Sequence, residues 1–413
     1  MITEFSIRNF KNLASVPSAD DKYVGFDSFN VLIGPNGCGK SSLLQAIDFL
    51  RAFFRSSVEV YLQERGWEYR DLPNLRQTRK SIHWGLVAHL DANSNGVGAG
   101  EYRYKITLQP RKHLGVSEES LAWTPSGSEE PEEHLLHRQG RKCSFLDRLT
   151  GSVVDREIIG LPASVMSRWD PERKDDRARY PEMLRFRGWI EQFRQYVIWD
   201  PKVLRSPDRG KHEEIGPSGE HLATVLGRLK DRNRSVFNRL VKRMRRLFPT
   251  LTDISVAGGG WGWRTIRLHE GNGRQVSFNS QQMSDGVLRL LAVTALLYLD
   301  RIPSVITFEE PENGVHPQLI REVVQILREI TQRKPPNRCQ VFVTTHSPYV
   351  LDEFFDTPEE IYCMDRHRPQ AGATITRLSE IRQLKIARAT FKESLGEAWT
   401  AGLIGATAGI GAS

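Results

Sequence analysis

Cysteine is scarce in this chain of 413 residues, and no two cysteines are close enough in sequence to form a recognisable motif. The four thiols, which never occur as C-x-x-C, are Cys38, Cys143, Cys339 and Cys363. This spacing excludes a simple zinc ribbon or zinc hook and offers no disulfide framework. We therefore expect a protein of the reducing cytoplasm.

Long apolar runs and targeting signals are also missing. The most apolar segment, residues 287–299, is too short to cross a bilayer and contains Arg289. Residues 1–5 show no basic start followed by an apolar stretch, so we expect no signal peptide. No sustained heptad repeat is present, which argues against a long coiled coil. The sequence therefore predicts no membrane contact.

The composition that remains is that of a folded globular protein. Hydrophobic residues make up 39% and charged residues 26% of the chain, and the length allows two or three domains. The formal net charge of +8 permits binding to a polyanion but does not require it.

Residues 34–42 read Gly-Pro-Asn-Gly-Cys-Gly-Lys-Ser-Ser, which is the spacing of a phosphate-binding loop. A short apolar run at 29–33 predicts a strand before it, and 42–50 predicts a helix after it. Backbone N–H groups of the loop and the helix N-terminus would surround phosphates. Lys40 would reach the β- and γ-phosphates of ATP, and the Ser41 hydroxyl would be a Mg²⁺ ligand. The predicted nucleotide-binding residues of this loop are Asn36, Gly37, Cys38, Gly39, Lys40, Ser41 and Ser42.

A second motif follows the apolar run at 304–308, which ends in Glu309 and Glu310. A buried strand ending in two carboxylates is the Walker B arrangement. We assign Glu309 to Mg²⁺ and Glu310 to the attacking water, which it would orient or deprotonate. The alternative is a buried strand that simply ends in a solvated acidic turn.

Two further stretches complete the set. Residues 341–348 form a β-rich run that ends in His346, at a position where parallel strands present functional groups. Residues 281–291 form a polar turn that opens a long apolar helix, so that Ser284, Asp285 and Gly286 could face an anion. Taken alone, that turn is equally an ordinary capped helix with Ser284 or Asp285 as the N-cap.

These motifs, together with the Asn-Phe-Lys turn at 9–11, resemble the ABC-type ATPase heads of the RecF, SMC and overcoming-lysogenization-defect group. The chain is most similar to the stand-alone AAA-type (domain 21) ATPases, several of which belong to anti-phage systems. The resemblance covers 1–50 and 277–365 well and 50–215 only in outline. It implies that His346 contacts the γ-phosphate and that residues 284–286 are the signature, which completes the nucleotide site of a second copy.

The resemblance implies an α/β fold: an ABC-type P-loop NTPase head, with a mixed sheet flanked by helices, an antiparallel β subdomain and an Arg-rich helical insert. We predict an N-terminal lobe at 1–75, the β subdomain at 76–164, the insert at 165–255, a C-terminal lobe at 256–365 and a tail at 366–413. Strands are expected at 2–10, 81–90, 102–108 and 116–123, with a loop at 124–133.

Three features depart from the family pattern. Glu309 stands where Asp is usual, which lengthens the reach to the metal and predicts slower hydrolysis. The signature reads Met-Ser-Asp-Gly, whereas transporters have Leu-Ser-Gly-Gly-Gln. No glutamine loop is identifiable, and Gln77 is only a hypothesis for it.

The Arg-rich insert contains apolar residues at helical spacing from 222 to 247, which predicts one amphipathic helix over 221–248. Its other faces carry nine basic residues and one acid, Asp231. The basic residues are Arg228, Lys230, Arg232, Arg234, Arg239, Lys242, Arg243, Arg245 and Arg246. Such a face can bind DNA or RNA phosphates, can be merely solvated, or can meet an acidic protein.

The leading functional hypothesis is an ATPase that works as a head-to-head homodimer or higher oligomer. Closure on ATP and reopening after hydrolysis would gate a separately encoded effector, a nuclease or toxin, in anti-phage defence. We expect no nuclease activity of its own, because residues 347–413 contain no Toprim-like acidic cluster. The alternative is a RecF-like DNA-repair ATPase that binds DNA directly. A transporter subunit is disfavoured, because its signature lies much closer to the phosphate loop than residue 284 lies to residue 41.

Overall fold

The computed structural model describes residues 1–405 with short gaps at 18–22, 55–57, 79, 93–95, 111–113, 130, 159–162, 198, 272–274, 336, 366–372 and 393. Parts of the predicted tail, 366–372, 393 and 406–413, lie outside the described residues. The chain divides into two units. Unit 1 comprises Met1–Phe193, Thr357–Ala387 and Ala401–Ser413, and unit 2 comprises Arg194–Asp356 and Arg388–Thr400.

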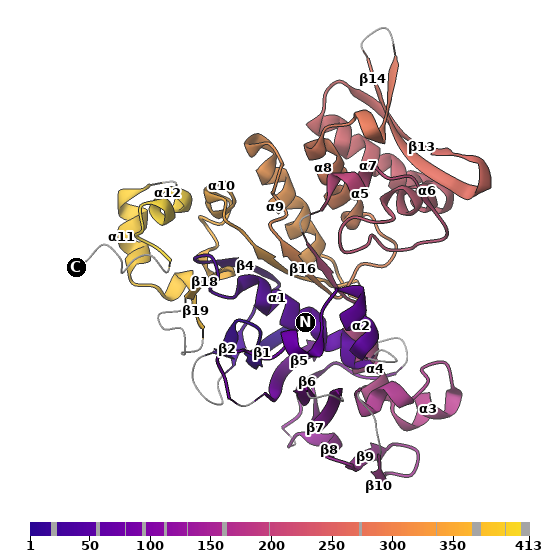
Figure 1. Cartoon of the computed structure of the whole chain (residues 1–413), viewed down its shortest axis with the longest axis vertical. Helices are drawn as coiled ribbons and strands as arrows, with labels where there is room; N and C mark the ends of the chain where they lie inside the picture. Colours follow the sequence, from indigo (N-terminus) through magenta and orange to yellow (C-terminus); the bar gives the residue numbers. More distant parts are fainter. Residues whose placement is uncertain are drawn as a thin grey trace. The chain divides into compact units, whose positions relative to one another are not determined.

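Unit 1 is built on a nine-stranded antiparallel sheet with the strand order β10-β9-β8-β7-β6-β5-β1-β2 and with β3 paired to β1 (Figure 1). Its strands are β1 (Ile2–Phe10), β2 (Leu13–Val16), β3 (Val24–Gly25), β5 (Ile82–Leu90), β6 (Gly100–Pro110), β7 (Leu114–Pro125), β8 (Glu133–Gln139), β9 (Lys142–Asp147) and β10 (Ser152–Glu157). The four strands expected from the sequence are confirmed. The loop expected at 124–133 is shorter, because 124–125 belong to β7 and 133 to β8, and residue 130 lies outside the described residues. Strands β8 to β10 were not predicted, because polar residues interrupt their alternation.

Helix α1 (Lys40–Phe49) packs on this sheet through aromatic side chains. Phe49 stacks on Trp84 of β5 with ring centroids 5.3 Å apart, and the Trp84 indole N–H donates to the Ala46 carbonyl oxygen at 3.0 Å. Trp84 is 2% exposed. Burial of two large rings and satisfaction of the indole donor fix the helix to β5.

The remaining elements of unit 1 include a second group of strands. Strand β4 (Phe29–Ile33) is fully buried and runs parallel to β18 (Ile361–Asp365), which pairs antiparallel with β19 (Thr374–Arg377). The other helices are α2 (Val58–Glu64), α3 (Lys174–Arg179) and α4 (Pro181–Glu191). Helix α11 (Gln383–Thr390) crosses the division between the units.

Unit 2 contains the parallel pair β16 (Val305–Glu309) and β17 (Gln340–Thr344), with β11 (Phe193–Tyr196) beside β16. Helix α8 (Asp285–Leu297) is apolar on nearly all sides and is buried accordingly, and it contacts the amphipathic α9 (Pro317–Thr331). The other helices of this group are α5 (Pro201–Arg205), α10 (Pro348–Asp352) and α12 (Leu395–Thr400).

The predicted single helix over 221–248 is wrong. The segment forms two helices, α6 (Leu222–Arg232) and α7 (Arg234–Leu247), separated at Asn233. The Asn233 backbone is not helical, and its side chain accepts the Val236 N–H, so Asn233 acts as the N-cap of a new helix. An interior asparagine therefore interrupts an otherwise continuous apolar stripe.

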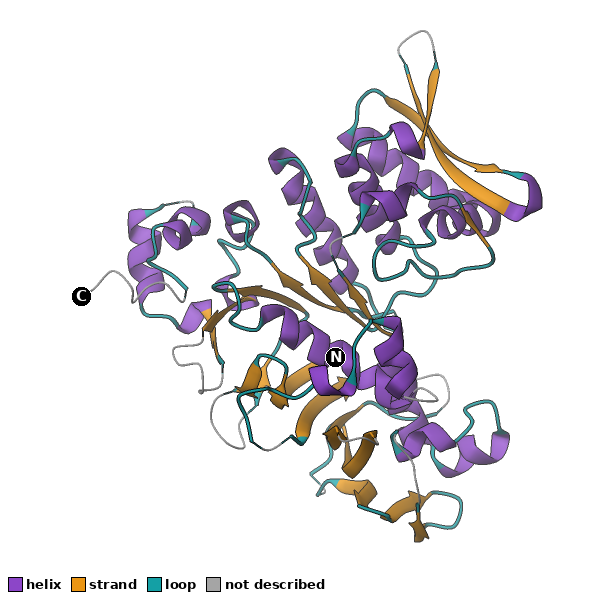
Figure 2. Cartoon of the chain, viewed as in Figure 1, coloured by secondary structure: helices purple, strands orange, loops and turns teal. Residues whose placement is uncertain are grey.

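A four-stranded antiparallel sheet lies beside these two helices (Figure 2). It consists of β12 (Asp208–Arg209), β13 (Leu251–Gly258), β14 (Trp263–Glu270) and β15 (Val276–Asn279). The Arg-rich segment predicted at 165–255 is thus shared between the units: α3 and α4 belong to unit 1, whereas α5, α6 and α7 belong to unit 2.

Candidate functional site

The phosphate loop of unit 1 occupies the turn between β4 and α1, as the sequence predicts. Gly34 and Gly39 have positive φ values of 146° and 112°. A Cβ atom at Gly34 would lie 2.1 Å from the Met364 carbonyl oxygen, and one at Gly39 would lie 2.4 Å from Leu13 Cδ2. Neither position can accept a side chain, so both glycines are required by the path of the loop.

Lys40 is buried at the start of α1, with 6% exposure. Its Nζ donates to the carbonyl oxygens of Gly34, at 2.7 Å, and Pro35, at 3.2 Å. The ammonium group therefore lies within the loop, where it can meet an anion. The loop tip, which includes Asn36 and Gly37, is exposed, and Ser41 is partly exposed.

Cys38 is the buried member of the loop. Burial raises the pKa of its thiol, an effect that the neighbouring Lys40 charge partly offsets. The thiolate is therefore disfavoured, and Cys38 packs as a small apolar residue rather than as a nucleophile.

The acidic end of β16 and the turn after β17 lie side by side in unit 2. Strands β16 and β17 are parallel, and Glu309 is in register with Thr344, so their carboxyl ends coincide. Glu310 follows with φ at 46°, and its N–H donates to the Thr344 carbonyl oxygen at 3.1 Å. His346 Nε2 lies 3.9 Å from Glu310 Oε1. A left-handed glutamate costs on the order of 1 kcal/mol, so strained backbone is held where two candidate catalytic side chains meet.

The Glu312 side chain links the turn after β16 to the turn after β17. Its Oε1 accepts the Thr345 hydroxyl at 2.5 Å, and that hydroxyl accepts the Ser347 N–H at 2.9 Å, so Glu312 supports the turn that carries His346. Within the described part of the chain, the buried Glu312 Oε2 has no hydrogen-bond partner. Burial raises the pKa of this carboxyl to about 7, although the Thr345 hydroxyl opposes the shift.

This pKa predicts a pH-dependent stability. The folded protein holds the Glu312 proton more tightly than the unfolded chain does, so stability is lost as pH rises from the ordinary carboxyl value of 4.5 to about 7. Glu312→Gln cannot ionise and avoids this loss. We expect its stability relative to wild type to increase over that range by up to about 3 kcal/mol and to level off above it. Melting curves at several pH values test this, with the exposed Glu359→Gln as control. A stability difference between Glu312→Gln and wild type that does not change with pH would contradict the raised pKa of Glu312.

Gln195 is a candidate site residue that was not predicted from the sequence. It lies on β11, is 1% exposed, and its Nε2 donates to Glu309 Oε1 at 3.1 Å. It can therefore orient the proposed metal ligand. Gln77, the hypothesis from sequence, lies in unit 1, where its backbone N–H donates to Asn74. No sequence signal marked Gln195, because its partner is 114 positions away.

The turn at 283–286 begins α8 in unit 2. Ser284 is the N-cap, and its hydroxyl accepts the Val287 N–H at 3.4 Å. The Asp285 carboxylate accepts a hydrogen bond from Arg205, which also donates to the Met283 carbonyl oxygen at 2.9 Å. Ser284 and Asp285 are exposed. A Cβ at Gly286 would lie 3.2 Å from the Gly314 carbonyl oxygen, so the helix start packs on the turn that follows β16.

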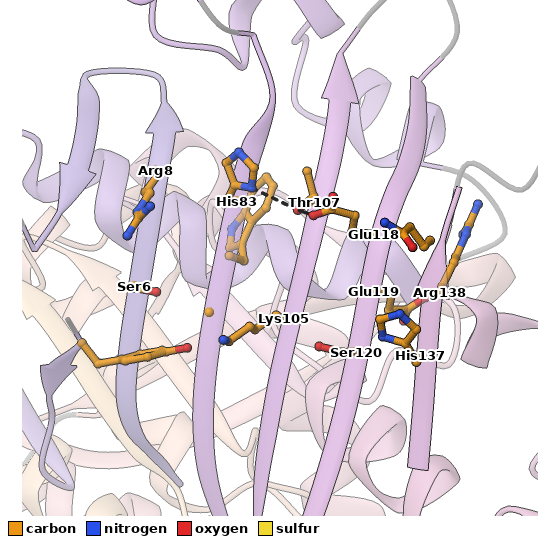
Figure 3. A pocket seen from close by; sticks show the side chains of 14 residues that line it. Ser6, Arg8, His83, Lys105, Thr107, Glu118, Glu119, Ser120, His137 and Arg138 are labelled. Atoms are coloured by element: carbon orange, nitrogen blue, oxygen red, sulfur yellow. Dashed lines mark hydrogen bonds between the residues drawn. The ribbon is translucent and has the colours of Figure 1, made fainter. Parts of the chain in front are cut away.

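A separate hollow of about 560 Å³ lies on one face of the nine-stranded sheet (Figure 3). Residues from five neighbouring strands form two cross-strand rows. The first row is Ser6, Gly85, Lys105, Ser120 and His137, and the second is Arg8, His83, Thr107, Glu118 and Gln139. His83 Nδ1 and the Thr107 hydroxyl are 3.0 Å apart. Charges of both signs line the hollow, which distinguishes it from the glycine-rich phosphate loop.

Three features together define an ABC-type ATPase head. They are a phosphate loop between a buried strand and a helix, an acidic strand end beside a histidine turn, and a capped apolar helix. The fold and the family resemblance predicted from sequence are confirmed. The chain belongs to the family described as "AAA domain, putative AbiEii toxin, Type IV TA system", whose model matches residues 29–352.

One solved structure supports the same fold, and two others show a weaker similarity. A crystallised Smc head bound to the C-winged helix domain of ScpA is 11% identical, has a TM-score of 0.52, and is matched over 92% of this chain and 99% of that chain. An Smc head with an extended coiled coil from Pyrococcus furiosus is 12% identical, with a TM-score of 0.47 and coverage of 94% and 99%. The recombination mediator RecF is 11% identical, with a TM-score of 0.39 and coverage of 91% and 98%. Of these three, the first supports the fold.

A comparison with curated proteins gives no match. No helix in the described ranges is both long and apolar enough to span a membrane.

Proposed function

We propose that this chain binds ATP through its phosphate loop and hydrolyses it with Mg²⁺. The observation that carries the proposal is the meeting of Glu310 and His346 at the ends of adjacent parallel strands. Glu310 would activate the attacking water, and His346 would contact the γ-phosphate.

Mg²⁺ fits the oxygen donors that the sequence assigns to it. The Ser41 hydroxyl at the start of α1 and the Glu309 carboxylate are hard ligands of the kind that Mg²⁺ prefers. Gln195 would keep the Glu309 carboxylate aimed at the ion, since one Glu309 oxygen already accepts its amide. When bound, the ion would neutralise charge on the β- and γ-phosphates.

We further propose a head-to-head dimer in which Ser284, Asp285 and Gly286 of one copy face the nucleotide of the other. The exposed N-terminus of the 13-residue α8 supports this, because its free backbone N–H groups and its dipole favour an anion. The experiment is to measure phosphate release with Mg²⁺ and with a chelator, and to measure molecular mass with a non-hydrolysable ATP analogue and with ADP. We expect Mg²⁺-dependent release and a dimer with the analogue alone. A monomer in both nucleotide states would contradict the dimer.

The same cycle would gate a separately encoded nuclease or toxin in anti-phage defence. The family description, which names a putative toxin and a Type IV toxin–antitoxin system, supports a link to such systems. Expression of the chain alone in a bacterium should be harmless, because the effector is absent. Toxicity of the chain alone would contradict a separate effector.

Direct DNA binding is a second candidate function, favoured by the basic face of α6 and α7. Helix α7 contains no acidic residue, and six basic side chains are exposed: Arg232, Arg234, Arg239, Lys242, Arg245 and Arg246. Two arginines that the sequence placed on this face are engaged in ion pairs. Arg228 pairs with Glu213, and Arg243 pairs with Glu329 and Glu322.

Charge reversal of Arg239, Arg245 and Arg246 to Glu tests this face without breaking the Arg243 pairs. If this face binds DNA, the triple variant should lose affinity for all DNA sequences alike. The slope of log affinity against log salt concentration should become shallower by the equivalent of about three phosphate contacts. Fluorescence anisotropy with labelled DNA at several salt concentrations measures both. Reversal of Arg156, Arg173 and Lys174, which are exposed in unit 1, is the matched control. Equal losses in both triple variants would contradict a localised DNA face.

A further inference from the structure

Three side chains with metal-binding atoms gather at the entrance to α6, away from the motifs described above. Asp208 belongs to β12, His212 to the following loop, and His221 precedes α6. One potential ligand atom from each lies within 4.8 Å of the other two. His221 Nδ1 lies 3.0 Å from Asp208 Oδ2, and the two imidazole rings stack with centroids 3.5 Å apart. All three residues are partly exposed, so an ion can reach them.

The backbone is shaped to bring these residues together. Gly210 has φ at 116°, and a Cβ there would lie 3.0 Å from His212 Nε2, so glycine leaves the room that the imidazole occupies. His221 itself is left-handed, with φ at 69°. A non-glycine residue in that conformation costs on the order of 1 kcal/mol. The positive φ values of Gly210 and His221 therefore bring the two histidines close to the Asp208 carboxylate.

Asp208 already has the outer partners that metal-bound carboxylates usually have. The Thr224 hydroxyl donates to its Oδ2 at 2.6 Å, and the Arg209 N–H donates to its Oδ1 at 2.8 Å. Such contacts orient a ligand before the ion arrives.

We propose that Asp208, His212 and His221 bind one zinc ion. Two imidazoles and one carboxylate suit Zn²⁺ better than Mg²⁺, which prefers oxygen donors throughout. Ligand atoms on a tetrahedral zinc are about 3.3 Å apart, and the two imidazoles must turn out of their stacked arrangement for both ring nitrogens to point at one ion. Water would occupy the fourth position. The ion would join the 208–221 segment to α6 and thereby fix the start of the basic helix pair.

Zinc uptake by the untagged full chain tests this site. Apoprotein is dialysed against Zn²⁺ with excess Mg²⁺, which occupies the oxygen ligands of the ATPase site, and bound zinc is measured by atomic absorption. We expect one zinc per wild-type chain and none in His212→Gln or Asp208→Asn. Thr224→Val should retain zinc with about 10-fold weaker affinity, because only the outer partner is lost. His134→Gln, on the exposed face of β8, should bind as wild type does.

Cobalt supplies a second readout, which reports the ligands and geometry of the bound ion. Co²⁺ at a tetrahedral site of nitrogen and oxygen ligands gives visible absorption bands, which should appear with wild type and be absent from the two ligand variants. Circular dichroism spectra that match wild type show that those variants are folded. Absence of stoichiometric zinc in wild type, or zinc retained by both ligand variants, would overturn the proposal. Neither result bears on ATP hydrolysis.

Discussion

Lys40→Ala is expected to weaken ATP binding by at least about 100-fold. The ammonium lies inside the phosphate loop, where it would form charge-assisted contacts to two phosphates, and the loss of such contacts costs about 3 kcal/mol. Titration with a fluorescent ATP analogue measures the change. The exposed Lys80→Ala is the matched control, because it removes the same charge from a surface side chain, which donates to the Gln77 carbonyl oxygen.

Folding must be checked in this variant, because Lys40 also holds the loop closed on itself. A circular dichroism melting curve close to that of wild type would separate lost affinity from lost structure. Retained ATP affinity in a folded Lys40→Ala protein would refute the assignment of the phosphate loop.

Glu310→Gln is expected to lower turnover by about 100-fold or more while ATP binding is retained. A carboxylate that accepts a proton from the attacking water contributes about 10² to 10⁴ in rate, and glutamine cannot replace it. Glutamine has nearly the same shape, so the strained backbone at this position and its hydrogen bond to Thr344 should be preserved. Phosphate release under saturating ATP measures turnover.

The same variant should accumulate ATP-bound dimers, since closure on ATP is unimpaired and reopening needs hydrolysis. Mass measurement with ATP should therefore show a dimer for Glu310→Gln and mostly monomer for wild type after turnover. Glu359→Gln, an exposed glutamate, is the control. Normal turnover in Glu310→Gln would remove Glu310 from the role of activating water.

The parts of the fold that depend on local pattern were predictable. The strands expected at 2–10, 81–90 and 102–108 lie within a residue or two of those observed, and the glycine spacing at 34–39 placed the loop between strand and helix correctly. The prediction of one long helix was wrong because Asn233 can either face solvent within a helix or cap a new one. The pattern of apolar residues is the same in both cases.

The parts of the site that depend on long-range contacts were not predictable. Gln195 meets Glu309, and Glu312 supports the turn at Thr345, through side chains separated by 114 and 33 positions. The cluster of Asp208, His212 and His221 has no motif spacing either, because a turn at Gly210 and a left-handed His221 bring it together. The roles of the loop residues, Glu309, Glu310, His346 and the 284–286 turn stay predictions until variants are measured.

The central claim is that the ATPase site is shared between two copies of the chain, and mixing two inactive variants tests it most directly. Lys40→Ala disables the phosphate loop, and Ser284→Arg blocks the opposing helix start. In a mixed dimer both defects fall on one site, and the other site is intact. Equal amounts should restore about a quarter of wild-type phosphate release, since half of randomly paired dimers are mixed and each has one working site. A mixture that never exceeds the activity of the separate variants would contradict the shared site.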